Sequence, residues 1–131
     1  MSQVNADFVA PPRILVVDDN PDTVDLVSRY LSWQGMVAVP AYSGQQCLEQ
    51  VRQGAVDVIV LDVMMPGMDG LEVCAALQQM ASARATSIIL LTACDDRETR
   101  LAGIKLGVSD FLRKNSEHWH TLQCNHSGMS F

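Results

Sequence analysis

The stretch from Val56 to Gly70, VDVIVLDVMMPGMDG, constrains the fold of this chain more than any other segment. Its apolar run, Val58 to Leu61, is rich in β-branched residues and is too short for a helix. Such a run predicts a strand that is buried on both faces, as in a parallel sheet. The run stops at Asp62, and Pro66-Gly67 and Asp69-Gly70 then indicate a loop, because proline fixes φ and glycine permits positive φ. The strand therefore carries a carboxylate at its carboxyl end.

Similar apolar runs recur along the chain and alternate with helical patterns. Strands are predicted to begin near residues 14, 37, 58, 88 and 110, and Pro40 marks the second as an edge strand. Asn20 can cap the first helix, Ser43 with Gln46 makes a capping box for the second, and Asp69 can cap the third. Strands about 20–30 residues apart with a helix between them form right-handed βαβ units. The sequence predicts a three-layer α/β fold with a doubly wound, parallel, five-stranded sheet.

Composition and charge narrow the class of protein. The 131 residues, 48% of them apolar, predict one domain over residues 13–114, with a flexible arm at 1–12 and an atypical tail at 115–131. A net charge of −6 argues against direct nucleic-acid binding. No run approaches the roughly 20 apolar residues of a membrane span, and no secretory signal is present, so we expect a cytoplasmic protein without membrane contact. The scattered cysteines Cys47, Cys74, Cys94 and Cys124 read as reduced thiols.

Polar side chains follow four of the five predicted strands. The first strand ends at Asp18 and Asp19, the third at Asp62, the fourth at Thr92 and the fifth at Lys114. Because the carboxyl ends of parallel strands lie along one edge of a sheet, we expect these side chains to converge there. Three carboxylates at such close quarters repel one another, and a hard divalent cation relieves that repulsion. Mg²⁺ fits best, because it accepts a few carboxylates and keeps several waters.

This set of groups is suited to phosphoryl chemistry. A carboxylate can attack phosphorus and form an acyl phosphate. Asp62 is the best candidate nucleophile, because it ends the central strand beside a loop with free backbone N–H groups. The metal and Lys114 would neutralise charge on the transferred group, and the Thr92 hydroxyl would donate a hydrogen bond to it.

The motifs resemble those of the receiver domain of a two-component response regulator. They are ILVVDDN at 14–20, VIVLDVMMPGMDG at 58–70, IILLTA at 88–93 and GVSDFLRK at 107–114. The resemblance implies a flavodoxin-like sheet of order 2-1-3-4-5. It implies that Asp62 is the phosphoacceptor, with Asp19 binding Mg²⁺ directly, Asp18 through water, and the Met64 carbonyl as another ligand. Thr92 and Lys114 would hold the phosphoryl group, and Phe111 matches the switch aromatic of the family.

The same resemblance implies a signalling phosphoacceptor rather than a turnover enzyme, within a two-component or phosphorelay system. A histidine kinase or a phosphotransfer protein would supply the phosphoryl group, and the face built by the fourth helix and fifth strand would change its contacts. Met64 and Cys94 stand where the family tunes hydrolysis of the acyl phosphate. Neither positions water well, so we expect at most slow self-dephosphorylation.

The carboxyl-terminal residues depart from the family pattern. Asn115 stands where the family has proline after its lysine, which puts the placement of Lys114 in question. The apolar residues of 115–131 lack helical regularity, so we expect a fifth helix that is short or atypical. A stunted helix would leave apolar surface, which a second copy could cover. A homodimer through this face, or through the fourth helix and fifth strand, is therefore an expected assembly. A metal site in the histidines of the tail has less support, because isolated tail histidines are usually solvated.

Two alternatives to the phosphoacceptor hypothesis follow from the sequence. One is a degenerate receiver that binds proteins without being phosphorylated, which Asn115 and the weak tail favour and the complete acidic set opposes. The other is an aspartyl phosphatase of similar fold. Such an enzyme needs a second carboxylate two residues after its nucleophile, and Met64 occupies that position.

Overall fold

Five parallel strands form one sheet in the order β2-β1-β3-β4-β5, which confirms the predicted fold class. The computed structural model describes residues 10–92 and 97–113. The strands are β1 (Arg13–Val17), β2 (Val37–Ala41), β3 (Val58–Asp62), β4 (Ser87–Thr92) and β5 (Asp110–Arg113). The predicted arm lies mostly outside these ranges, and the predicted fifth helix lies wholly outside them.

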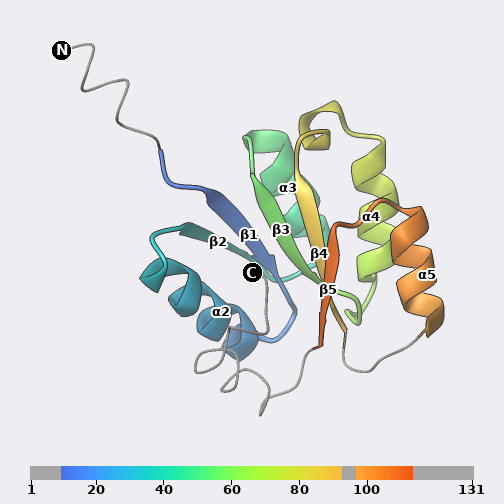
Figure 1. Ribbon diagram of the computed structural model, residues 1–131, viewed down its shortest axis with the longest axis horizontal. Helices are drawn as coiled ribbons and strands as arrows, with labels where there is room; N and C mark the ends of the chain where they lie inside the picture. Colours follow the sequence, from blue (N-terminus) through green and yellow to red (C-terminus); the bar gives the residue numbers. More distant parts are fainter. Residues whose placement is uncertain (1–9, 93–96, 114–131) are drawn as a thin grey trace.

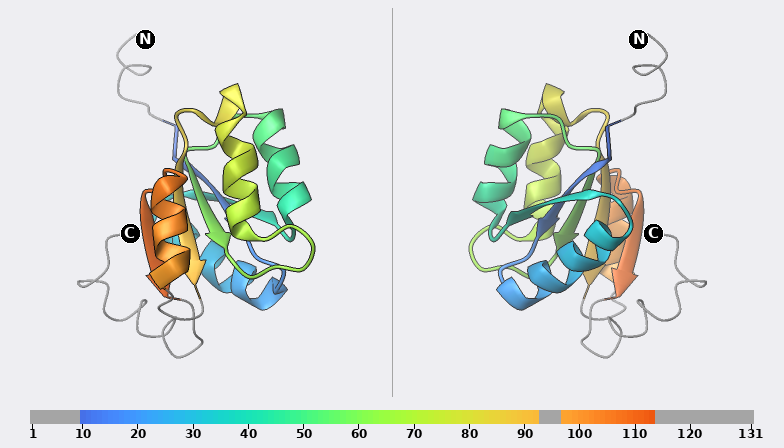
Figure 2. Two further views of the ribbon diagram at one scale, coloured as in Figure 1. Left: turned by 90° about the vertical axis from the view of Figure 1, so that its right-hand side faces the viewer. Right: turned by 90° about the vertical axis from the view of Figure 1, so that its left-hand side faces the viewer.

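Helices cover both faces of the sheet (Figures 1 and 2). They are α2 (Pro21–Trp33), α3 (Gly44–Gln53), α4 (Gly70–Gln78) and α5 (Arg97–Lys105), with a short 3₁₀ turn η1 (Ala81–Ala83) before β4. The 3₁₀ turn lies in the connection between α4 and β4. One apolar cluster joins α3 and α4 to one face of the sheet, and a second joins α2 to the other. The result is a layered α/β domain.

The division of each strand between two cores explains its continuous apolar sequence. In β1, Leu15 and Val17 belong to the cluster of α3 and α4, whereas Ile14 and Val16 belong to the cluster of α2. All four side chains are buried. Successive side chains of a strand point to opposite faces, so a strand covered on both faces must be apolar at every position.

Side chains that accept backbone hydrogen bonds start three of the helices. The Asn20 side chain accepts from the N–H of Asp22, and Asp69 exchanges two hydrogen bonds with Glu72 in a full capping box. The box predicted for Ser43 and Gln46 is half wrong. The Ser43 hydroxyl does accept from the Gln46 N–H. The Gln46 side chain, however, accepts from the N–H of Tyr42 at 2.9 Å, and not from that of Ser43.

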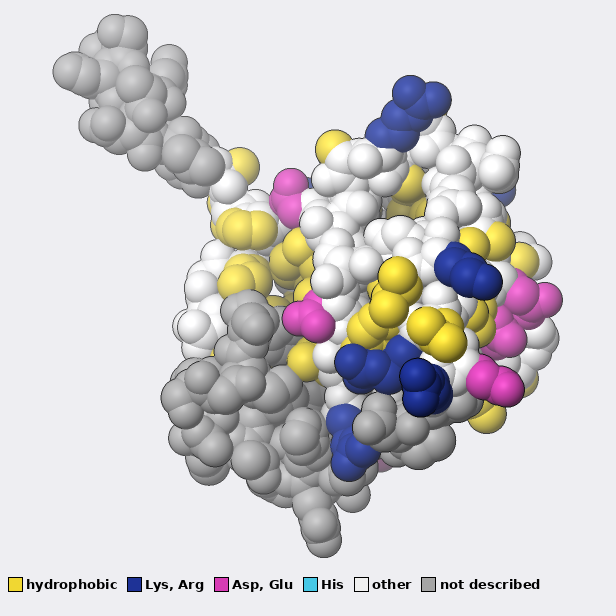
Figure 3. Space-filling view, turned by 45° about the vertical axis from the view of Figure 1, so that its right-hand side comes forward, with side chains coloured by type: hydrophobic (Ala, Val, Ile, Leu, Met, Phe, Trp, Pro, Cys, Tyr) yellow, Lys and Arg dark blue, Asp and Glu magenta, His cyan; other side chains and the backbone are white. Residues whose placement is uncertain are grey.

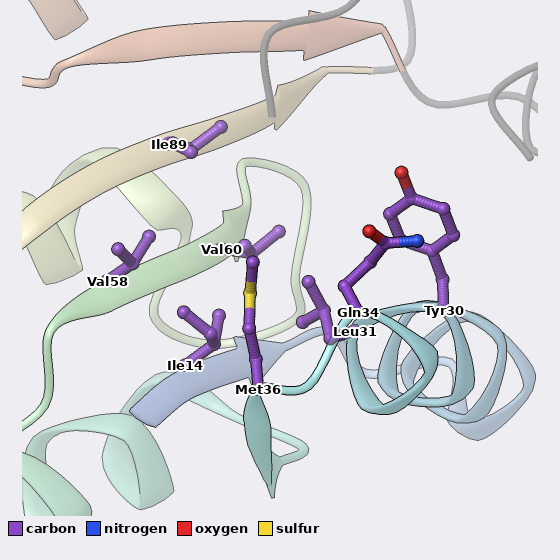
Figure 4. A pocket seen from close by; sticks show the side chains of 8 residues that line it. All are labelled: Ile14, Tyr30, Leu31, Gln34, Met36, Val58, Val60 and Ile89. Atoms are coloured by element: carbon purple, nitrogen blue, oxygen red, sulfur yellow. The ribbon is translucent and has the colours of Figure 1, made fainter. Parts of the chain in front are cut away.

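An apolar pocket of about 130 Å³ opens between α2 and the sheet face beside it (Figure 4). Ile14, Val58, Val60 and Ile89 line it from three strands, and side chains of α2 and the following turn complete it. None of these residues belongs to the turns after β1 and β3, so this pocket is separate from the predicted site. Within the described ranges, no helix combines the length and apolar character needed to cross a membrane.

Two thiols are sealed in the core between α3 and α4. Cys47 and Cys74 are fully buried and carry no disulfide. Burial raises the pKa of each thiol from 9.0 to about 12. The charge of a neighbouring group raises each pKa by a smaller amount. Cys74 does so for Cys47, and Asp69 does so for Cys74. The folded protein therefore keeps both thiols protonated at alkaline pH, where the thiols of the unfolded chain ionise.

We expect the free energy of unfolding to fall as the pH rises from 9 towards 12, in part because of these thiols. The unfolded state loses its protons first, so the stabilisation is complete below pH 9 and declines above it. Denaturant unfolding between pH 8 and pH 11 measures the slope. Cys47→Ala should be less stable at pH 8, because it leaves a cavity, yet lose less stability as the pH rises. Equal slopes for the variant and the parent chain would contradict this account.

Candidate functional site

Three aspartates from two strand ends meet at the carboxyl edge of the sheet. Asp18 directly follows β1 and Asp62 ends β3, and these two strands are neighbours. Carboxylate oxygens of Asp18, Asp19 and Asp62 lie within 4.8 Å of one another. Asp18 and Asp62 are buried, while Asp19 is exposed. Two carboxylates of the cluster are therefore buried, and the third leaves the cluster open to solvent on one side.

Local hydrogen bonds hold the acidic turns in place. One Asp18 carboxylate oxygen accepts from the N–H of Asn20 at 2.9 Å, and Asn20 then caps α2. One Asp62 carboxylate oxygen accepts from the N–H of Met64 at 3.3 Å. The turn after β1 and the start of the loop after β3 are thus each tied to one carboxylate of the cluster.

Gly70, the first residue of α4, allows that helix to pack closely against the end of β3. The Gly70 N–H donates to the Val63 carbonyl at 2.8 Å. A Cβ atom on Gly70 would lie 2.5 Å from the Asp62 carbonyl oxygen and 2.8 Å from the Val63 Cα. Positive φ is found at Gly67 in this loop, at 78°, but not at Gly70. Gly67 is thus a loop glycine, as the sequence predicts, and Gly70 is the first residue of the helix that Asp69 caps, at a close backbone approach.

The other predicted site residues have different placements. Thr92 is the last residue of β4, half-buried, next to the strand that ends at Asp62. Met64 is 70% exposed. Phe111 is half-buried in β5, the strand beyond β4. Lys114, Cys94 and Asn115 lie outside the described residues, and so do the tail histidines.

The chemistry of the acidic cluster fits a Mg²⁺ ion. All three side chains offer hard oxygen ligands, and their spacing suits one small cation. Mg²⁺ sites use one or two carboxylates and keep several waters, which the exposed side at Asp19 allows. A soft metal would need thiolate or imidazole ligands, and the described members of this cluster offer none. Asp18, Asp19 and Asp62 would hold the ion, with the Met64 carbonyl as a further oxygen.

A doubly wound parallel sheet with an aspartate cluster at its carboxyl edge defines a class of α/β domain that binds ligands where its strands end. Comparisons with known proteins narrow the class. The model of the response regulator receiver domain family matches residues 14–123. Response regulator PleD of Caulobacter vibrioides is 41% identical over 102 residues, which cover 78% of this chain and 22% of PleD.

Two further proteins are similar to this chain. Response regulator MprA of Mycobacterium ulcerans is 41% identical over 102 residues, covering 78% of this chain and 43% of MprA. The structure of chemotaxis protein CheY4 of Vibrio cholerae superposes with a TM-score of 0.77 at 31% identity, and covers 88% of this chain and 98% of CheY4. The chain belongs to the response regulator receiver domain family of two-component signalling. It spans less than half the length of PleD and MprA.

Two features near the site were not found from the sequence. One is the close approach at Gly70. The other is the contact of Arg100 in α5 with Phe111, whose ring centroid lies 5.0 Å from the guanidinium carbon. A Cβ atom on Gly103 would lie 2.9 Å from two carbons of that ring, so Phe111 packs directly on the backbone of α5. Neither contact can be recognised from the local sequence, because each joins elements whose relative position depends on the whole fold.

Proposed function

We propose that this receiver domain takes a phosphoryl group onto Asp62 in the presence of Mg²⁺, and that a histidine kinase or a phosphotransfer protein supplies the group in the cytoplasm. The observation that carries the proposal is the aspartate cluster, in which Asp62 stands on the central strand within 4.8 Å of two further carboxylates. Such a cluster is costly to bury without a cation, and its open side at Asp19 gives access to a donor.

Asp62 is the group that reacts in this proposal. One of its carboxylate oxygens attacks the phosphorus of a phosphohistidine, an O–P bond forms, and the N–P bond to the imidazole breaks. Mg²⁺, when bound, supplies positive charge that offsets the charge on the transferred oxygens. The Met64 N–H already lies beside the Asp62 carboxylate and can donate to the product. Thr92 ends the neighbouring strand and would donate its hydroxyl, and Lys114 keeps its predicted role as a cation.

The acyl phosphate would act as a switch rather than as an intermediate of a turnover enzyme. Phosphorylation replaces the single charge of the Asp62 carboxylate with a phosphoryl group of up to about two negative charges beside Thr92, a net gain of about one. Movement of Thr92 would change the space at the β4–β5 boundary, where Phe111 packs against α5. A shift from 1:99 to 99:1 between two states needs about 5.5 kcal/mol of differential interaction. Several new charge-assisted hydrogen bonds are of that order.

The test is uptake of a phosphoryl group from a small donor. We expect the intact protein to gain the mass of one phosphoryl group when it is incubated with acetyl phosphate and Mg²⁺. Omission of Mg²⁺ should suppress the gain, because the acidic cluster then repels the donor. Intact-protein mass spectrometry measures both results. Decay of the modified species after removal of the donor should take minutes or longer, because neither Met64 nor Cys94 positions water.

The outcome of this test also distinguishes a phosphoacceptor from a degenerate receiver that is not phosphorylated. A folded sample that gains no phosphoryl group with Mg²⁺, and whose unfolding midpoint does not respond to Mg²⁺, would support a degenerate receiver. The unfolding measurement matters because a weak donor alone can fail to modify a competent protein. Mg²⁺ at ten times its dissociation constant should raise the free energy of unfolding by about 1.4 kcal/mol.

A further inference from the structure

The turn between β2 and α3 holds the acidic turn after β1, although it contributes no carboxylate to the cluster. β2 ends at Ala41, whose carbonyl accepts the N–H of Asp18 at 3.1 Å. Both residues are fully buried, so this hydrogen bond is shielded from water. Ser43 then caps α3, which begins at Gly44. The start of α3 is therefore connected through three residues to the turn that carries Asp18.

On its other side, the start of α3 is in contact with Met68, in the loop after β3. A Cβ atom on Gly44 would lie 3.0 Å from the Met68 Sδ and 3.1 Å from the Met68 Cβ. It would also lie 2.7 Å from the Cγ2 methyl carbon of Val73 in α4. The φ angle of Gly44 is not positive, so glycine is required here for space rather than for backbone conformation. Met68 and Val73 together fill the space that a side chain at Gly44 would need.

The loop that contains Met68 begins at Asp62. One carboxylate oxygen of Asp62 accepts the N–H of Met64 at 3.3 Å, so the first turn of the loop is linked to this carboxylate. Met65 is buried in the core that α3 and α4 share, and Met68 is partly buried against the same core. The two methionines therefore anchor the two halves of the loop, and Met68 does so at the start of α3.

We propose that Met68 is a positioning residue for the acidic cluster. Through Gly44 and the turn after β2, it connects the loop that follows Asp62 to the strand end that holds Asp18. Carboxylate oxygens of these two aspartates lie within 4.8 Å of each other, and this spacing then depends on an apolar contact outside the cluster. Ligands that are held in place before an ion arrives bind it more tightly, because less conformational freedom is lost on binding.

The inference rests on the proposed function, because it concerns the site to which that function assigns Mg²⁺ and the phosphoryl group. A purely stabilising role of Met68 would give a different pattern of effects. Leu77 supplies the comparison, because it is buried in the same core but lies near the end of α4, about two helical turns beyond Gly70. Loss of the Leu77 side chain should destabilise the whole domain without releasing the loop.

The first experiment measures hydrogen exchange of the Met64 amide by NMR, in protein without Mg²⁺ and without a phosphoryl donor. This amide donates to the Asp62 carboxylate, so its exchange reports local opening of the loop beside that carboxylate. We expect Met68→Ala to exchange about tenfold faster than the parent chain at this amide. Met68→Leu keeps the apolar volume and should stay within about twofold of the parent. Leu77→Ala should also stay within about twofold, although it unfolds at a lower denaturant concentration.

The second experiment measures the dissociation constant of Mg²⁺ by isothermal titration calorimetry. Met68→Ala should raise it about tenfold, because the oxygen ligands are held less firmly, whereas Met68→Leu and Leu77→Ala should keep the value of the parent chain. Phosphoryl uptake from acetyl phosphate by Met68→Ala should be slow at low Mg²⁺ and should recover at saturating Mg²⁺. The variant retains Asp62, so the defect lies in binding of the ion rather than in the chemical step.

Charge does not enter these comparisons. Each substitution exchanges one uncharged side chain for another, so the net charge of −6 is the same in every variant. The basic side chains that repel a cation gather on the face that carries α5 and β5, and all of them are retained (Figure 3). A change in Mg²⁺ affinity therefore reports the placement of the ligands and not the field of the protein.

Gly44→Ala tests the same contact from the side of α3. The added methyl group would meet both Met68 and Val73, so the comparison uses Mg²⁺ affinity rather than stability. Gly44→Ala alone should weaken Mg²⁺ binding about as much as Met68→Ala. In the double variant the second change should add less than about twofold, because both changes disrupt one contact. Effects that multiply in full would show that the two residues act separately, and would overturn the proposal.

The outcomes separate this inference from the proposed function. Amide exchange requires neither the ion nor a donor, so it tests the role of Met68 even if the parent chain takes up no phosphoryl group. An unchanged Met64 amide in Met68→Ala would overturn the inference, and so would equal acceleration in Leu77→Ala. Faster exchange with an unchanged Mg²⁺ dissociation constant would overturn it as well, because the loop would then open without moving the ligands. Far-UV circular dichroism establishes that each variant is folded, and Met68→Val gives the same test if the alanine variant is not.

Discussion

Asp62→Asn is expected to abolish phosphoryl uptake, with a loss of at least about 100-fold relative to the parent chain. The amide oxygen of asparagine is a weak nucleophile, and the variant cannot form the acyl phosphate. Asp62 has the position that the chemistry requires, on the central strand, almost fully buried and within 4.8 Å of Asp18 and Asp19. Intact-protein mass spectrometry after incubation with acetyl phosphate and Mg²⁺ measures the result.

The matched control is Asp57→Asn. Asp57 lies just before the same strand, at its other end, and one of its carboxylate oxygens accepts the N–H of Arg13 at 2.8 Å. The two variants make the same chemical change and remove the same charge, so they differ only in position. Asp57→Asn should gain one phosphoryl group at the rate of the parent chain. Uptake by the Asp62 variant, or loss in the Asp57 variant, would contradict the assignment of the phosphoacceptor.

Stability offers a second, independent readout of the same substitution. Removing one carboxylate from the cluster relieves repulsion, so Asp62→Asn should be more stable than the parent chain without Mg²⁺. Mg²⁺ should then stabilise the variant much less, because the ion has lost one ligand charge. Denaturant unfolding with and without Mg²⁺ measures both differences. A variant that Mg²⁺ stabilises as strongly as the parent would show that Asp62 contributes little to ion binding.

The architecture was predictable because the sequence of each strand reflects which of its faces are buried. Ile14 and Val16 face one core while Leu15 and Val17 face the other, and this double burial forces the continuous apolar run that reads as a parallel strand. The approach of Asp18 to Asp62 then follows from topology alone, since parallel strands end at one edge. The burial of Asp18 beside an exposed Asp19 depends on how the turn after β1 is folded, and the sequence carries no pattern for it.

Contacts between distant elements were the part that the sequence did not predict. One missed contact is local instead: Gln46 follows Ser43 at the spacing of a capping box, yet its side chain accepts from the N–H of Tyr42, four residues earlier. Arg100 and Phe111 stand on different elements, and their contact depends on the packing of α5 against β5. Such contacts arise from tertiary packing, which local propensity and periodicity do not encode.

Gly70→Ala is expected to lower the free energy of unfolding by about 3 kcal/mol, at the upper end of the range for overpacked sites. In most helices this substitution is stabilising, because alanine has the higher helix propensity by up to about 1 kcal/mol. Here the added methyl group would lie 2.5 Å from the Asp62 carbonyl oxygen and 2.8 Å from the Val63 Cα. Both are backbone atoms of the central strand and the loop after it, so no side chain can rotate away.

The control is Gly54→Ala, at the end of α3, where a Cβ atom meets nothing within 4 Å and the backbone is extended. This variant should change stability by less than about 0.5 kcal/mol. Relief of the clash at Gly70 requires α4 to move away from β3, and Asp62 moves with its carbonyl. Gly70→Ala should therefore lose Mg²⁺ stabilisation and phosphoryl uptake as well as stability. A Gly70 variant that matched the Gly54 variant in all three measurements would show that α4 can shift without disturbing the site, and that the close approach does not position Asp62.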